Sequence, residues 1–263
     1  MWSFPFSGFL DLLCPPNCPV CGELVENPPG KNDPICSACL QKIVTPEGQF
    51  CRRCGGRRPV LPDNPNTKEC VRCRMTNFRF KRAIALGEYE TDLRMLVLRM
   101  KTDRTGMLAI SAARVWARYR RAELESVGAD YIVPVAMHHL RRGDRGVNSP
   151  DLLAAELGTQ LKIPVANHLI RRIRQTDLQY MLSRQARTEN VAGAFALRPP
   201  GLWEKLGFTT GTPFIGKTVL LVDDILTTGS TCNEVTKVLL AAGVQNVSVA
   251  VLARAEGSLS RMQ

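Results

Sequence analysis

The chain has 263 residues, 44% of them hydrophobic, which is enough for one or two globular domains with buried cores. A formal net charge of +11 and a pI near 9.4 favour anionic partners, either phosphorylated metabolites or nucleic acid. No stretch approaches the run of about 18 apolar residues that a membrane span needs, and the N-terminus lacks the basic start and cleavage site of a secretory signal. We therefore predict no membrane span and a cytoplasmic location.

The first part of the chain is dominated by cysteines, eight of which form four Cys-x-x-Cys pairs. Two such pairs separated by about 15 residues match the spacing of a structural zinc site, and a reducing cytoplasm disfavours disulfides. We predict two structural zinc sites and favour sequential pairing of the motifs over interleaved pairing. The predicted ligands are Cys18, Cys21, Cys36 and Cys39 for the first ion, and Cys51, Cys54, Cys70 and Cys73 for the second. The two remaining cysteines, Cys14 and Cys232, are expected to be small buried residues.

Arginines cluster around the second group of cysteines. A zinc ion held by four thiolates has no open coordination position, so this module is expected to stabilise or bind rather than to catalyse. The arginines could contact nucleic acid, or they could be solvated counter-charges for the anionic zinc-thiolate sites, and the sequence leaves both interpretations open. They are Arg52, Arg53, Arg57, Arg58, Arg72 and Arg74.

The residue pattern changes near residue 78, and we predict an N-terminal segment with a double zinc ribbon at 1–77 and a second domain at 78–263. Apolar patterns predict a strand over 83–89, helical spacing over 93–100, a longer helix that begins at Thr105 or Gly106, and a strand over 131–135. A helix capped by Ser149 or Asp151 should follow. Strands that alternate with helices predict a parallel α/β sheet with its ligand at the carboxyl ends of the strands.

Two polar segments interrupt this alternation. Residues 137–148 contain Arg142 and Arg145 and are expected to form a cationic loop directly after a strand. Residues 169–195 are too polar for a core and too irregular for a clean amphipathic helix, so they could form a lid. A glycine- and proline-rich loop is expected over 197–216.

The stretch from residue 218 to residue 231 carries the strongest functional signal. Apolar residues at 219–222 predict a buried strand, which Asp223 and Asp224 are expected to end. A hydroxyl-rich turn follows, and then a helix over 232–242. The backbone amides at that helix N-terminus, with Gly229 allowing close approach, suit a phosphate, whereas the two carboxylates suit sugar hydroxyls or magnesium. A phosphorylated sugar fits both halves.

The residues Val-Leu-Leu-Val-Asp-Asp-Ile-Leu-Thr-Thr-Gly-Ser-Thr closely resemble the phosphoribosyl-pyrophosphate (PRPP) signature of type I phosphoribosyltransferases. The resemblance implies an α/β fold with helices on both faces of a parallel sheet, and PRPP bound with magnesium. It implies that Asp223 and Asp224 hold the ribose hydroxyls, and it makes Arg142 and Arg145 candidates for stabilising the departing pyrophosphate. The implied cradle for the 5-phosphate is Thr227, Thr228, Gly229, Ser230 and Thr231.

The zinc-ribbon front, the Arg-x-x-Arg-Gly-Val-Asn motif at 142–148 and the polar run at 169–195 together resemble the ComF family of phosphoribosyltransferase-like proteins. The family is associated with DNA uptake in natural transformation, and its acceptor is generally unknown. Two hypotheses follow. The first is a magnesium-dependent phosphoribosyltransferase. The second is a non-catalytic protein with a regulatory PRPP site that binds single-stranded DNA or assembles with a DNA-uptake ATPase or membrane complex.

Overall fold

The computed structural model describes residues 17–25, 35–46, 50–57, 70, 73, 76–136, 148–174, 184–198 and 214–255. The predicted cationic loop lies outside these residues except for Asn148, and so do Arg142, Arg145 and Cys14. The elements, in chain order, are α2 (Ser37–Ile43), β1 (Ala83–Glu88), α4 (Thr91–Met100), α5 (Met107–Tyr119), α6 (Arg121–Glu125), β2 (Tyr131–Pro134), α8 (Ser149–Leu161), β3 (Ile170–Arg172), α9 (Arg184–Val191), β4 (Phe195–Leu197), β5 (Thr218–Leu226), α11 (Ser230–Ala241) and β6 (Asn246–Arg254).

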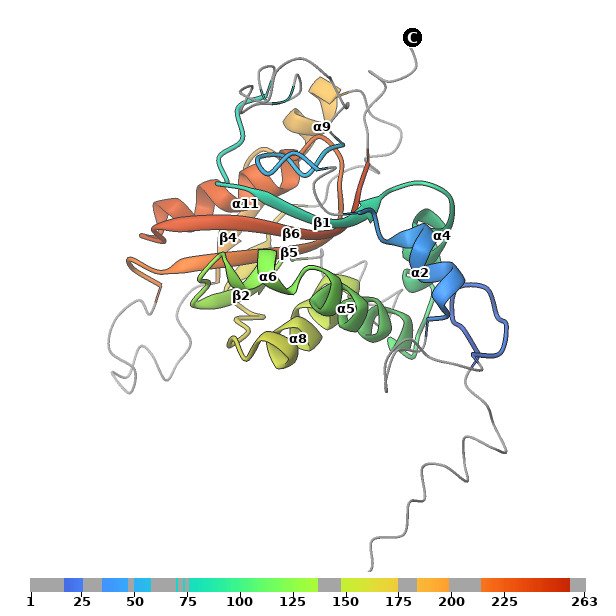
Figure 1. Cartoon of the computed structure of the whole chain (residues 1–263). Coiled ribbons are helices and arrows are strands. Elements are labelled where there is room, and N and C mark those ends of the chain that lie inside the picture. The colour runs from blue at the N-terminus through green and yellow to red at the C-terminus, as the bar shows by residue number, and fades with distance from the viewer. Residues whose placement is uncertain are drawn as a thin grey trace, which may run out of the picture.

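The centre of the molecule is a parallel sheet with the strand order β1-β6-β5-β2 (Figure 1). Leu221 of β5 is in register with Val133 of β2 on one side and with Val249 of β6 on the other. A single parallel bridge between Ile132 and Val165 extends the sheet beyond β2. β5 is a central strand, and its residues Val219–Val222 are fully buried because side chains from both layers cover it. The predicted parallel α/β sheet is confirmed.

Helices cover both faces of the sheet (Figure 1). Leu220 and Val222 belong to a hydrophobic cluster with α4, α5 and α8, whereas Val219 and Leu221 belong to a second cluster with α11 and the antiparallel strands β3 and β4. This division follows from the alternation of side chains along a strand. Successive residues at the carboxyl end of β5 are therefore delivered to opposite faces of the sheet.

The structure corrects three sequence predictions in detail. β5 does not end at the acidic pair but continues to Leu226, so Asp223 and Asp224 lie inside a strand. α8 is preceded by Asn148 as its N-cap residue, and Ser149 is already its first helical residue. The segment 169–195, predicted to be too polar for a core and too irregular for a clean helix, contributes β3, α9 and the start of β4, and its Ile170 and Phe195 belong to the second cluster. The lid remains a prediction.

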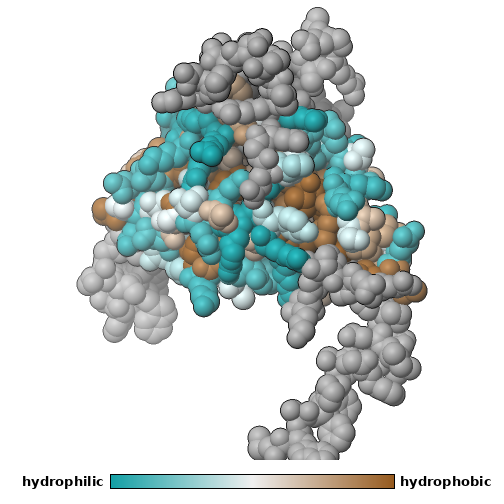
Figure 2. Space-filling view, in the orientation of Figure 1, coloured by the Kyte–Doolittle hydropathy of each residue, from teal (hydrophilic) through white to brown (hydrophobic). Residues whose placement is uncertain are grey.

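The cysteine-rich part packs directly onto the sheet domain. Cys18, Cys39 and Leu40 are buried in the first hydrophobic cluster, and Cys51 and Cys54 are buried in the second. The predicted division at residues 77 and 78 remains a prediction, but the two parts share their cores. The face shown in Figure 2 is mostly hydrophilic, with hydrophobic residues in separate patches. None of the helices in the described ranges combines the length and apolar character needed to cross a membrane.

Candidate functional site

The two cysteine groups are built on the same local turn. In the first, an antiparallel bridge joins Asn17 to Leu24 and the Gly22 amide donates to the Cys18 carbonyl at 2.7 Å. In the second, a bridge joins Phe50 to Arg57, and Gly55 and Cys51 make the equivalent hydrogen bond at 2.8 Å. Both glycines have positive φ, 83° and 65°, which a residue without a Cβ adopts most easily. Each turn aims the two sulfurs of one Cys-x-x-Cys motif to the same side.

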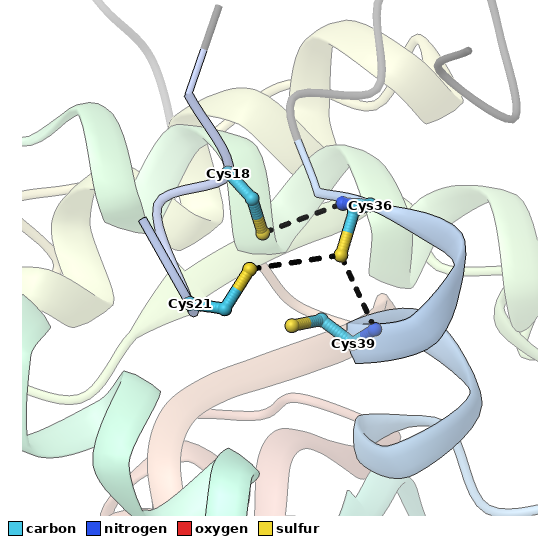
Figure 3. A group of neighbouring side chains, drawn as sticks. All are labelled: Cys18, Cys21, Cys36 and Cys39. Carbon is cyan, nitrogen blue, oxygen red and sulfur yellow. Dashed lines mark hydrogen bonds between the residues drawn. The ribbon is translucent and has the colours of Figure 1, made fainter. Parts of the chain in front are cut away.

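The first group brings Cys18 and Cys21 opposite the start of α2, which carries Cys36 and Cys39 (Figure 3). The four sulfurs point toward one another and lie within 4.8 Å of each other. The amide of Cys36, the N-cap residue of α2, donates to Cys18 Sγ at 3.4 Å and so favours the thiolate form of Cys18. The structure thus brings together the four sulfurs that sequential pairing of the motifs predicts.

The second group joins Cys51, Cys54, Cys70 and Cys73 in the same way. Its sulfur separations include 3.8 Å for Cys51 and Cys73 and 3.4 Å for Cys54 and Cys70. Four ligands placed about 2.3 Å from one zinc ion in a tetrahedron have sulfurs about 3.8 Å apart, which matches both groups. The donor sets and their geometry therefore support two structural zinc ions.

Each group contains one thiol whose pKa is lowered. Burial raises the pKa of Cys18, but backbone amides of Cys21 and Cys36 outweigh it and lower that pKa to about 7. A hydrogen bond from the Cys54 thiol lowers the pKa of Cys51 to about 4. The pKa of Cys54 is raised, first by its hydrogen bond with Cys51, and burial raises the pKa of Cys39 and Cys73, so these shifts favour one thiolate in each group.

Two adjacent carboxylates lie at the carboxyl end of β5. Asp224 Oδ2 is 3.4 Å from Nζ of Lys101, the residue that follows α4. Asp223 lies toward α11, where burial first and then its charge raise the pKa of the Cys232 thiol. Burial, followed by repulsion from Asp224, raises the pKa of Asp223 well above its usual value. The two acids are thus held together against their mutual repulsion, which is characteristic of a site that receives hydroxyl donors or a cation.

The predicted phosphate loop connects this acidic pair to α11. Gly229 has φ 85° and forms the N-cap of α11 without a side-chain cap of its own, and the Ser230 amide donates to the Thr228 hydroxyl at 3.3 Å. The hydroxyls of Thr228 and Ser230 lie 2.8 Å apart. The first turn of α11 contains no acidic residue. A partly buried helix N-terminus with neighbouring hydroxyls and no acidic residue in its first turn is suited to bind a phosphate.

Lys101 is presented to the acidic pair by a turn organised around Asp103. The Asp103 carboxylate accepts hydrogen bonds from the amides of Thr105 and Leu108, each at 2.9 Å, and from the Thr105 hydroxyl at 2.6 Å. Although burial opposes it, these hydrogen bonds lower the pKa of Asp103. Gly106 closes the turn with φ 75°, and a Cβ there would lie 2.4 Å from Leu152 Cδ1. The turn is therefore held at both ends, and it fixes the position of Lys101, the C-cap residue of α4.

Comparison with known proteins agrees with both halves of this description. Residues 9–74 match the double zinc ribbon domain, and residues 153–261 match the phosphoribosyl transferase domain. Competence protein F of Haemophilus influenzae is 31% identical over 228 residues, covering 84% of this chain and 90% of that protein. This chain belongs to the competence protein F (ComF) family.

Other proteins are similar to this ComF-family chain. DNA utilization protein YhgH of Salmonella typhi is 30% identical over 223 residues, covering 84% of this chain and 90% of that protein. Among solved structures, the purine phosphoribosyltransferase from Pyrococcus horikoshii aligns with a TM-score of 0.32 and 18% identity, over 65% of this chain and 78% of that one.

Some contacts of this ComF-family site were not predicted from the sequence. Lys101 follows an amphipathic helix and is separated from Asp224 by more than a hundred residues, so only the fold shows their proximity. Arg254 is fully buried at the end of β6, beside the phosphate loop. The one available signal was an arginine ending an otherwise apolar strand, since a buried arginine must find acceptors. Cys232, predicted to be buried, is 1% exposed.

Proposed function

We propose that this protein binds PRPP with magnesium at the carboxyl end of β5 and transfers its phosphoribosyl group to an acceptor. In this proposal Asp223 and Asp224 bind the ribose hydroxyls, while residues 227–231 bind the 5-phosphate. Arg142 and Arg145 stabilise the pyrophosphate as the bond to C1 breaks. Magnesium bound with the substrate would neutralise part of the pyrophosphate charge, and the acidic pair is the oxygen-rich group beside it.

The observation that carries the proposal is the continuous path from acidic pair to phosphate loop. β5 ends at Leu226 and α11 begins at Ser230, so only Thr227–Gly229 separate the strand from the helix N-terminus. A connection this short supports the proposal, because a single ligand could then contact both the carboxylates and the helix amides. The raised pKa of Asp223 supports the proposal, because burial and the charge of Asp224 outweigh the hydrogen bond that Asp223 accepts from the Asp224 amide, and such perturbed carboxylates are common at ligand sites.

We place this activity in the use of DNA taken up by the cell. The support is the family itself, in which one relative is named competence protein F and another DNA utilization protein. A direct DNA contact through the second ribbon is less well supported than it was from the sequence. Arg53 donates to the backbone carbonyls of Phe78, Phe80 and Lys81, so its guanidinium is already used in intramolecular hydrogen bonds. Nε of Arg57 lies 3.5 Å from Oε1 of Glu88, so this arginine forms an ion pair within the protein.

The proposal is tested by calorimetric titration of the zinc-loaded protein with PRPP, with and without magnesium. We expect saturable binding that is stronger with magnesium, and pyrophosphate release when the correct acceptor class is supplied. Ribose without phosphate should not bind measurably, because the loop amides contribute only to phosphate binding. Equal heats for PRPP and buffer in the presence of magnesium would contradict the proposed site.

A second prediction extends the proposal to Lys101, which lies 3.4 Å from the proposed ribose ligand Asp224 and which we therefore assign, with Arg142 and Arg145, to the pyrophosphate on C1. Lys101→Met is expected to weaken PRPP binding about tenfold, since it removes a charge-assisted contact. Binding of ribose 5-phosphate, which carries no pyrophosphate, should change less than about twofold. Titrations of both ligands measure this difference.

Lys217→Met is the matched control for Lys101→Met. Lys217 pairs with Asp130 at 3.0 Å, where Asp130 also accepts from the amide of Thr218 at the amino end of β5. It is therefore a lysine–aspartate pair at the other end of the same strand. If both variants lose PRPP affinity equally, or if Lys101→Met weakens the two ligands equally, Lys101 does not contact pyrophosphate.

A further inference from the structure

The second zinc ribbon and the phosphate loop share one buried arginine. Arg254 is fully buried, and its Nε donates to the Cys54 carbonyl at 3.0 Å. Its Nη1 donates to the carbonyls of Leu226 and Thr227, where β5 becomes the loop, and to Ala255 at 3.0 Å. One guanidinium therefore joins the backbone of a zinc ligand to the first residues of the phosphate loop. The planar donor arrangement of arginine fixes several carbonyls relative to one another, which a single ammonium cannot do.

A second connection runs through residues 76–82, the segment between Cys73 and β1, which we call the strap. A Cβ on Gly229 would lie 2.7 Å from Phe78 Cε1, so the strap packs closely against the N-cap of α11. Asn233 in the first turns of α11 accepts from the Arg79 amide at 2.9 Å and donates to the Asn77 carbonyl at 3.2 Å. The strap thus supports the start of the helix whose amides point to the ligand.

The ribbon in turn holds the strap. Arg53 lies between Cys51 and Cys54, the two ligands of one motif, and its guanidinium donates to carbonyls of Phe78, Phe80 and Lys81. It also lies over both rings, 5.9 Å from the centroid of Phe78 and 5.8 Å from that of Phe80. Contacts of a guanidinium with both carbonyls and aromatic faces position the strap from the side of the metal.

We infer that the second zinc ribbon positions the phosphate loop, with Arg254 and Arg53 as the positioning residues that connect them. This inference rests on the proposed function, since it assigns the ribbon a role in binding the 5-phosphate. The zinc-bound turn at Cys51–Cys54 holds Arg53 and the Cys54 carbonyl in place. Arg254 then fixes Leu226 and Thr227, and the strap fixes Gly229. The loop amides are held in their binding geometry before the phosphate arrives, which reduces the ordering cost of binding.

Among the residues that the structure describes, a second buried arginine supplies a matched control. Arg120 is 2% exposed and donates from Nε to the Ala85 carbonyl at 3.0 Å and from Nη2 to the carbonyls of Leu86 and Thr45. It therefore joins the end of the first ribbon to β1, and it lies 5.7 Å from the ring centroid of Phe50, whereas its backbone acceptors Ala85, Leu86 and Thr45 lie outside residues 226–231. Arg254→Met and Arg120→Met remove the same kind of group from the same kind of environment.

The test measures hydrogen–deuterium exchange and ligand affinity in the zinc-loaded, full-length protein. Arg254→Met is expected to speed exchange of the amides at 226–231 about tenfold, because their local opening becomes easier. It should also weaken binding of ribose 5-phosphate about tenfold, corresponding to partial loss of loop preorganisation. Arg120→Met should speed exchange in β1 instead and leave ribose 5-phosphate affinity within about twofold. Zinc content is measured for every sample.

Arg254→Lys and Arg53→Met keep the test decisive if Arg254→Met does not fold. Arg254→Lys retains the charge but not the fork and should give an intermediate change, and Arg53→Met should increase exchange in both the strap and the loop. Equal loop exchange in the Arg254 and Arg120 variants would overturn the inference, and so would unchanged ribose 5-phosphate affinity in Arg254→Met. If the wild-type protein binds no ribose 5-phosphate, the proposed function fails, and the exchange data still decide whether the ribbon positions the loop.

Discussion

Asp224→Asn is expected to weaken PRPP binding about 100-fold, equivalent to ~2.7 kcal/mol. In the proposed site this carboxylate accepts from a ribose hydroxyl and faces Lys101 at 3.4 Å, so the amide loses both the charge and part of the hydrogen bonding. The substitution also removes the repulsion that raises the pKa of Asp223. The melting temperature of the Asp224→Asn variant should therefore stay close to that of the wild type. Calorimetry with PRPP and magnesium measures the affinity, and thermal unfolding verifies the fold.

Asp130→Asn is the control for this substitution. Asp130 also pairs with a lysine and also contacts the backbone of β5, but at the amino end of the strand. Ligands of parallel α/β sheets bind at the carboxyl ends, so this variant should keep PRPP affinity within about twofold. A comparable loss in both variants would mean that the effect reflects the stability of β5. Full affinity in Asp224→Asn would remove the acidic pair from the site.

Cys54→Ser is expected to reduce the zinc content from two ions per chain to one and to destabilise the protein by more than about 4 kcal/mol. Cys54 is 0% exposed and belongs to the cluster that contains Phe78, Phe80 and Leu226. Loss of the ion therefore disrupts the ribbon, and it also frees the Cys51–Cys54 turn, which packs on the sheet. For a chain of this size the melting temperature should fall by roughly 10 °C or more. Elemental analysis and thermal unfolding measure the two quantities.

Cys232→Ser separates metal loss from the burial of a hydroxyl. Cys232 is 1% exposed in the same cluster but is not part of either cysteine group. Its substitution should keep two zinc ions and cost about 1–2 kcal/mol, the usual penalty for a buried polar atom. Two zinc ions in Cys54→Ser, or equal destabilisation of both variants, would contradict a structural metal at the second group.

The sequence predicted the elements whose residues interact locally. The apolar run before Asp223 and the repeating apolar residues of α4 and α11 each indicate one element, and each is found in the structure. The Cys-x-x-Cys spacing indicated the zinc ligands because the two residues of each motif are close along the chain. The end of β5 was predicted too early, because acidic residues usually end a buried strand. Here parallel pairing with β6 carries the strand to Leu226.

The sequence alone determined the family resemblance, the parallel α/β class, the two cysteine groups and the candidate phosphate loop, since all of these depend on residue type and short spacing. Only the tertiary structure decided what surrounds the loop. Lys101 reaches Asp224, and Arg254 reaches both Cys54 and Thr227, through contacts between distant parts of the chain. Such contacts depend on how strands and helices pack, and no local pattern encodes that packing. The same packing turns the second ribbon from an appended zinc module into a neighbour of the candidate PRPP site.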